Sequence, residues 1–172
     1  MHITKPEVSE YPGFNASYVD MVEENDLIAA LKNSEKKIVD LVKSISEEKA
    51  DHRYDSGKWS IKEIIIHLSD AERVFAYRAL RFSRNDRTEL SGFDENHWVP
   101  ESNASARTLE DILHEFILVR QSSLFLFKNL TKEMSMRKGI ANGKEVSVRA
   151  IGYVICGHAL HHYKIIKERY LK

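Results

Sequence analysis

The chain has few residues that interrupt helices and strands or cross-link the chain, with one cysteine, three prolines and seven glycines among 172 residues. Its one cysteine, Cys156, cannot form an internal disulfide, which fits a reducing compartment and predicts a cytoplasmic protein. No apolar run approaches the length of a membrane span, and the first residues lack the apolar core of a signal peptide. Scarce glycine and proline favour long regular elements.

An excess of either charge is also absent, because 26 lysines and arginines balance 26 aspartates and glutamates. Such a chain has no overall field to attract nucleic acid or an anionic membrane, and we expect neither as a partner. Its 42% hydrophobic and 30% charged residues are usual for a globular protein. The length is enough to bury one core, so we predict one domain over residues 1–172.

Residues 1–22 are predicted to form an arm outside that core. Pro6, Pro12 and Gly13 interrupt any long helix here. We expect an extended arm with a short helical lead-in at its end. Its aromatic side chains can anchor it to the body, and these are Tyr11, Phe14 and Tyr18.

Four stretches repeat apolar residues at intervals of three and four, the period of an α-helix. They cover about 23–46, 60–82, 108–130 and 148–171. Each has one apolar stripe and one polar face, so each needs the others to bury its stripe, and the chain predicts an all-α four-helix bundle. Ser60 and Glu63 match a capping box at the start of the second helix.

The connections on either side of the third helix differ in kind. Asn142-Gly143 favours a tight turn, so residues 136–140 and 144–148 are predicted to pair as a small hairpin before the fourth helix. Residues 83–107 form a long polar crossover between the second and third helices, and a loop of this length is often functional. Two interpretations fit it: a lid over a pocket, or a loop pinned by Phe93 and Trp98 with its acidic residues in solvent.

Histidines interrupt the apolar stripe of the fourth helix, which runs through Val148, Ile151, Ile155, His158, His162 and Ile165. His158 and His162 therefore lie one turn apart and face the core. His67 lies on the apolar side of the second helix. Three neutral imidazoles from two helices can bind one metal ion and leave positions open for water or substrate. The alternative is a set of core histidines that are hydrogen-bonded to neighbours and bind no metal.

Other polar groups near these histidines have weaker assignments. His161 and Asp70 are candidates to orient or assist the ligands, although His161 also suits packing and Asp70 also suits an ion pair with a nearby arginine. Cys156 is expected to pack as a small hydrophobe rather than to serve as a fourth ligand. Arg120, beside the apolar stripe of the third helix, either binds an acidic group or extends to solvent. No pair of residues suits a nucleophile and its base, so the catalytic residues stay unassigned.

The sequence resembles the DinB-like superfamily, and within it the YfiT-like branch of metal-dependent enzymes. The resemblance covers nearly the whole chain in order, and it is carried by Gly57-Lys58-Trp59-Ser60-Ile61-Lys62-Glu63, His67-Leu68-Ser69-Asp70-Ala71-Glu72-Arg73, Gly92-Phe93-Asp94-Glu95-Asn96 and Gly157-His158-Ala159-Leu160-His161-His162, with Glu10-Tyr11 and Ala141-Asn142-Gly143. It implies a four-helix bundle that binds nickel or zinc through His67, His158 and His162, the three residues that the spacing selects. It also implies a homodimer.

The activity that the resemblance implies is a metal-dependent reaction on a small molecule. Characterised relatives attach low-molecular-weight thiols such as bacillithiol or mycothiol to electrophiles, or use such a thiol in an isomerisation. We therefore expect a thiol-dependent S-transferase, with a low-molecular-weight thiol as one substrate, or a hydrolase. The alternative is a non-catalytic bundle, in which the metal only braces the helices or which binds a small ligand or partner.

Overall fold

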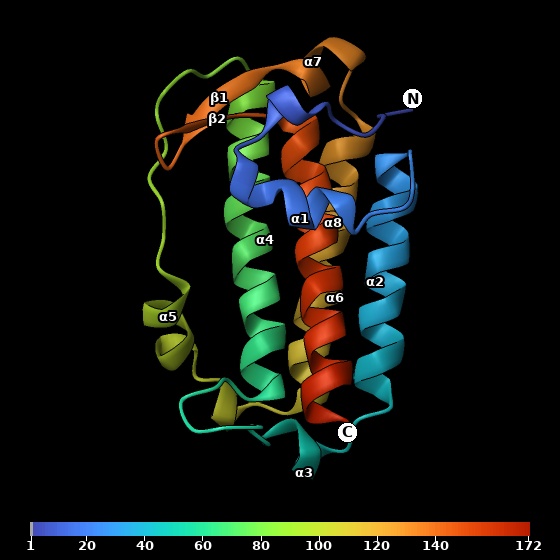
Figure 1. Cartoon of the computed structure of the whole chain (residues 1–172), viewed down its shortest axis with the longest axis vertical. Coiled ribbons are helices and arrows are strands. Elements are labelled where there is room, and N and C mark those ends of the chain that lie inside the picture. The colour runs from blue at the N-terminus through green and yellow to red at the C-terminus, as the bar shows by residue number, and fades with distance from the viewer. Residues whose placement is uncertain (1) are drawn as a thin grey trace.

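Four long helices form the body of the protein in a computed structural model that describes residues 2–172 (Figure 1). They are α2 (Leu27–Lys43), α4 (Ile61–Ser83), α6 (Leu109–Lys128) and α8 (Val148–Ile165), with the one-turn α3 (Glu47–Ala50) between the first two. Helices α2 and α4 each pack against both α6 and α8, so α2 and α4 occupy diagonal corners. The predicted all-α four-helix bundle is confirmed.

A crossover of residues 84–108 separates α4 from α6. It runs along the outside of the bundle from one end to the other, so α6 starts at the end where α4 starts and the two helices run in the same direction (Figure 1). The predicted long connection is present, but it is not a plain loop. It contains α5 (Glu95–Trp98) and two short 3-10 helices, Val99–Ser102 and Ala104–Ala106.

Side-chain caps fix where the helices begin. The predicted capping box of α4 is confirmed: the Ser60 Oγ accepts from the Glu63 N–H at 3.2 Å, and the Glu63 Oε2 accepts from the Ser60 N–H at 2.6 Å. Asp26 caps α2 by accepting from the Ala29 N–H at 3.1 Å, so this helix starts later than the predicted residue 23. Helix α8 also ends earlier than predicted, and a π-helical turn, Ile166–Tyr170, follows it.

The predicted hairpin is confirmed as two antiparallel strands, β1 (Lys138–Ala141) and β2 (Lys144–Ser147). Asn142 and Gly143 turn between them with φ angles of 52° and 68°, which asparagine and glycine tolerate best. The short α7 (Lys132–Met136) precedes the hairpin, so the first strand starts later than predicted.

The core has two apolar clusters with a polar layer between them. One cluster includes Phe82, Phe127 and Tyr153, and the other includes Ile38, Phe116 and Ile166. Near the middle of each long helix lie buried polar side chains instead, namely Ser34, Glu72, Arg120 and His158. The bundle therefore keeps polar groups at its centre, where the histidines are.

Arg120 is fully buried. Of the two predicted alternatives, it binds an acidic group and does not extend to solvent. Its Nε donates to the Glu72 Oε1 at 2.8 Å, and its Nη2 donates to the Oε2 at 2.8 Å. Its Nη1 donates to the Leu31 carbonyl oxygen at 2.8 Å and to the Ser34 Oγ at 2.7 Å. One side chain thus links α6 to both α4 and α2 through the core.

The surface of α6 exposes two large apolar side chains, Leu118 by 58% and Phe125 by 59%. They are seven residues apart and so share a helix face. Such a face suits a protein–protein contact, and the homodimer stays a prediction. Among residues 2–172, no helix has the length and apolar character needed to cross a lipid bilayer.

The N-terminal arm packs on the bundle through the 3-10 helices Val8–Glu10 and Gly13–Asn15 and through α1 (Ala16–Asp20). The predicted short helix at the end of the arm is present as α1, whereas the stretch before it is not simply extended, because it contains the two 3-10 helices. Helix α1 approaches α8 so closely that a Cβ on Gly157 would lie 1.9 Å from the Tyr18 carbonyl oxygen, so only glycine fits there. Tyr11 is buried as expected, but Phe14 is 64% exposed and does not anchor the arm in the core.

Arg149, near the start of α8, holds the arm through Glu10. Its Nε donates to the Glu10 Oε2 at 2.8 Å, its Nη2 donates to the Oε1, and the Ser147 Oγ donates to the Oε2 at 2.8 Å. Burial alone would raise the pKa of Glu10. These hydrogen bonds, with one from the Glu7 N–H at 3.0 Å, outweigh burial and lower the pKa from its ordinary 4.5 to about 2.

We expect Glu10→Gln to lower the free energy of unfolding by about 1.5–3 kcal/mol near neutral pH, because it removes the charge from these hydrogen bonds. A carboxyl with a depressed folded-state pKa stabilises the fold above the unfolded value of 4.5, and this contribution is lost as pH falls toward about 2. Urea denaturation from about pH 7 to about pH 3 should show a difference from wild type that shrinks with falling pH. A difference in stability that stays constant with pH would contradict the lowered pKa of Glu10. Glu23→Gln, at an exposed position, should behave as wild type at every pH.

Candidate metal centre

Three histidines from two neighbouring helices meet inside the bundle. His67 comes from α4, and His158 and His162 come from consecutive turns of α8. One ring nitrogen of each lies within 4.8 Å of those of the others, and the His67 Nε2 is 3.0 Å from the His158 Nε2. None of the three is more than 8% exposed. The structure thus brings together the three residues that the helical spacing selects.

Burial keeps all three imidazoles neutral. It lowers the pKa of His67 to about 4. It also lowers the pKa values of His158 and His162 well below the ordinary value, and the neighbouring imidazoles add to this effect. Each ring then has one nitrogen with a free lone pair, which is the state that metal binding requires.

Hydrogen bonding between the three rings occupies at most one of these lone pairs, that of the Nε2 atom that accepts in the His67–His158 contact. The two facing Nε2 atoms can share at most one proton, and within residues 2–172 the buried His162 Nδ1 has no hydrogen-bond partner. Imidazole nitrogens that each bind one transition metal ion at about 2.0–2.1 Å lie about 3 Å apart. The three nitrogens therefore fit a divalent transition metal. The alternative, core histidines that bind only to neighbours, would leave the buried His162 Nδ1 without a hydrogen bond.

Aromatic rings surround the three histidines. The ring centre of Trp59 lies 4.8 Å from that of His67 and 6.4 Å from that of His162, on which it stacks. Tyr18 of α1 meets the His158 ring edge-on, with 5.6 Å between ring centres. These contacts restrict the rotation of the imidazoles and leave one side of them open.

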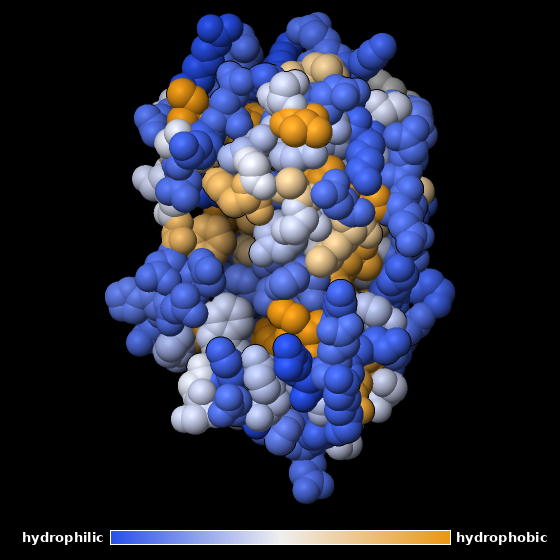
Figure 2. Space-filling view, in the orientation of Figure 1, coloured by the Kyte–Doolittle hydropathy of each residue, from blue (hydrophilic) through white to orange (hydrophobic). Residues whose placement is uncertain are grey.

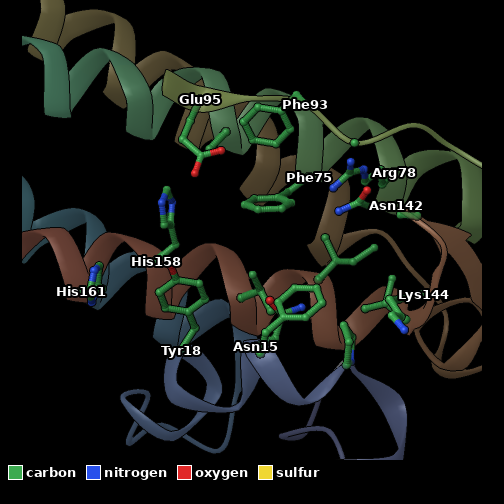
Figure 3. A pocket seen from close by; sticks show the side chains of 18 of the residues that line it. Asn15, Tyr18, Phe75, Arg78, Phe93, Glu95, Asn142, Lys144, His158 and His161 are labelled. Carbon is green, nitrogen blue, oxygen red and sulfur yellow. The ribbon is translucent and has the colours of Figure 1, made fainter. Parts of the chain in front are cut away.

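That open side faces a cavity of about 420 Å³ (Figure 3). The arm, α4, α8, the hairpin and the crossover all contribute to its wall. On the face seen in Figure 2 the surface is hollowed, and apolar surface gathers around the hollow. The crossover supplies Phe93 and Glu95 to the wall, which agrees with the interpretation of this segment as a cover over a pocket. Trp98 is 44% exposed, so it does not pin the crossover by full burial.

Comparison with known proteins places the chain in a family. Residues 30–166 match the family model of the DinB superfamily. The chain belongs to this superfamily. A relative from Oceanobacillus iheyensis, named as a candidate metal-dependent hydrolase, is 25% identical over 131 residues, which are 73% of each chain.

A solved structure extends the comparison to the fold. YfiT from Bacillus subtilis is described as a probable metal-dependent hydrolase with an unusual four-helix bundle topology. It matches with a TM-score of 0.68 over 95% of this chain and 90% of YfiT. At 18% sequence identity, this likeness shows that the DinB chain has the YfiT fold.

The remaining predicted site residues lie outside the three-histidine group. His161 is half-buried and lines the cavity, with 5.2 Å between its ring centre and that of His162. Asp70 does not orient His67: among residues 2–172 its carboxylate bonds to Arg73, at 3.2 Å, and to no histidine. Cys156 is fully buried, and burial raises the pKa of its thiol to about 12, so it packs as a small hydrophobe as expected.

Several side chains that line the cavity were not singled out as site residues from the sequence, namely Asn15, Tyr18, Arg78, Glu95, Asn142 and Lys144. Arg78 carried a usable signal, because it falls on the same stripe of α4 as His67 and Ala71. The others lie on the arm, the hairpin or the crossover. No helical period connects those segments to the histidines.

Proposed function

We propose that this DinB protein is a metal-dependent enzyme that adds a nucleophile to a small electrophilic substrate. With water as the nucleophile it is a hydrolase, and with a low-molecular-weight thiol it is a thiol-dependent S-transferase. The proposal is carried by three buried, neutral imidazoles that face an open cavity, with no further His, Cys, Asp or Glu of residues 2–172 grouped with them. A structural zinc site is usually closed by a fourth protein ligand.

His67, His158 and His162 would hold the ion, and imidazole ligands suit zinc and nickel, the two metals that we propose. When bound, such an ion acts as a Lewis acid that lowers the pKa of water or of a thiol enough to make it a nucleophile near neutral pH. The chain itself keeps the imidazoles neutral by burial and limits their rotation through the surrounding aromatic rings.

Glu95 is the one carboxylate of residues 2–172 that lines the cavity. Figure 3 shows Glu95 at the same end of the cavity as His158. Tyr18 contacts this histidine, and its pKa is raised by burial and by the charge of Glu95. A carboxylate at this place can accept a proton from the incoming water or thiol. Glu95 is therefore the residue that we propose as the general base.

The relatives support the hydrolytic form of the proposal. The protein from Oceanobacillus iheyensis is named as a candidate metal-dependent hydrolase, and YfiT is described as a probable one. The thiol-dependent form rests on the resemblance of the sequence to the wider superfamily. Both forms share the same metal ligands and differ in the nucleophile, so one experiment can separate them.

The test starts from chelator-treated protein that is reloaded with zinc or nickel. It should hydrolyse a member of a panel of small activated esters and amides, or conjugate a low-molecular-weight thiol to chlorodinitrobenzene. The expected rate is on the order of 100-fold or more above that of His158→Ala. A rate that needs the thiol identifies the S-transferase, and His114→Ala, at an exposed site on α6, should keep the full rate. No rate above that of His158→Ala in either assay, with either metal, would favour the alternative of a non-catalytic bundle.

A further inference from the structure

Three arginines are buried among residues 2–172, and two of them have a carboxylate partner. Arg120 pairs with Glu72, and Arg149 pairs with Glu10. Arg78 is only 8% exposed, yet within the same part of the chain it forms no ion pair. A buried cation without a counterion is unfavourable, so this exception needs a physical reason.

The guanidinium of Arg78 is held in place by other contacts. Its Nη2 donates to the Ser91 carbonyl oxygen at 2.7 Å, and its Cζ lies 5.8 Å from the ring centre of Phe75 and 5.9 Å from that of Phe93. Within residues 2–172 its Nε and Nη1 have no hydrogen-bond acceptor, and the side chain lines the cavity. Burial also lowers the pKa of Arg78, as expected for a cation without an acidic neighbour. The free donors therefore face the space that a ligand would occupy.

Asn142 and Lys144 of the hairpin lie on the same side of the cavity as Arg78 (Figure 3). The turn that carries them is joined to the crossover, because the Leu90 carbonyl oxygen accepts from the Asn142 N–H at 2.9 Å. Gly92 makes room for the Asn142 side chain, since a Cβ on Gly92 would lie 2.6 Å from the Asn142 Oδ1. An amide and an ammonium group thus supply further donors at this end.

His158 and Glu95 lie toward the other side of the cavity in Figure 3. Along α4, Arg78 follows His67 by eleven residues, which is about 16 Å at 1.5 Å per residue. Phe75 and Phe93 line the wall next to the guanidinium. The cavity therefore has a cationic end, an apolar wall and a metal-binding end.

We propose that Arg78, together with Asn142 and Lys144, binds an anionic oxygen group of the substrate, either a carboxylate or a phosphate. The substrate class is then a small anion with an apolar body, whose reacting end reaches the histidines. Only the placement of the reacting end rests on the proposed function. The anion site itself rests on the contacts of Arg78.

Isothermal titration calorimetry with three probes tests this site: 3-phenylpropionate, phenyl phosphate and the neutral 3-phenylpropanol. Wild type should bind at least one of the anions about tenfold or more tightly than the alcohol. Arg78→Met should lose this preference and keep the affinity for the alcohol. Arg87→Met removes the same charge from an exposed arginine outside the cavity and should bind as wild type. The tighter anion assigns the group as carboxylate or phosphate.

Thermal unfolding without ligand is the second measurement. Arg78→Met should unfold at the same or a higher temperature than wild type, because it removes a buried charge that has no counterion. A purely structural role predicts the opposite, a lower Tm with unchanged anion preference, and that result would overturn the proposal. Equal anion binding by wild type and Arg78→Met, or no anion preference in wild type, would overturn it as well.

Both measurements are made on metal-loaded and on chelator-treated protein. Anion binding that persists in Arg78→Met and disappears on chelation would place the anion at the metal and contradict the proposal. Neither measurement requires turnover. A protein that binds anions through Arg78 but catalyses no reaction would therefore overturn the proposed function and leave the anion site standing.

Discussion

The Arg120→Met protein is expected to lose about 3–5 kcal/mol of its free energy of unfolding. Methionine fills a similar space, but the substitution removes all five hydrogen bonds that the guanidinium donates, three of them to Glu72. Glu72 is only 3% exposed, so its charge would stay in the core without a partner. This unpaired charge, rather than the loss of the ion pair itself, is the larger part of the expected effect.

Urea denaturation followed by circular dichroism measures the loss. The double variant Glu72→Leu/Arg120→Met removes both charges and should recover more than half of it. Arg107→Met is the matched control, since Arg107 also binds two carboxylates, but at the surface, and should lose no more than about 1 kcal/mol. A double variant as unstable as Arg120→Met would show that the unpaired charge is not the cause.

Arg120 also shows how far the sequence alone could be interpreted. Its place beside the apolar stripe of the third helix followed from the helical period, but the identity of its partner did not. Glu72 is 48 residues away on α4, and the two meet only because the crossover lets α4 and α6 run side by side. Arg78 is a similar case: it shares a stripe with His67, but the hairpin and the crossover build the cavity that it faces.

Features with local signals were predictable, because the residues that make them are close in sequence. The Ser60 and Glu63 box, the Asn142 turn and the stripe of α8 histidines belong to this class. The N-terminal arm was predicted less well, since its place depends on the contact between Glu10 and Arg149, which are 139 residues apart. Its composition shows where helices break and gives no sign of the distant residue that holds it.

Alanine at any one of His67, His158 and His162 is expected to remove most of the bound metal. Loss of a group that merely orients a ligand already costs about 10–100-fold in metal affinity, and loss of a ligand costs more. Dialysis against zinc or nickel, followed by elemental analysis, gives the metal content of each protein. His161→Ala is the matched control, because His161 lies next to His162 and lines the same cavity but is not in the three-histidine group, and it should keep its metal.

The stability of the same variants separates loss of the site from loss of the fold. Metal at 100 times its Kd should raise the free energy of unfolding of wild type by about 2.7 kcal/mol, and the three variants should show no such rise. Without metal they should remain folded, because the two apolar clusters of the bundle do not depend on the histidines. Full metal content in all three variants would rule out the three-histidine site. Unfolding of wild type by a chelator alone would instead make the ion a structural brace between α4 and α8, since an ion that serves only catalysis can leave a bundle whose core is already complete.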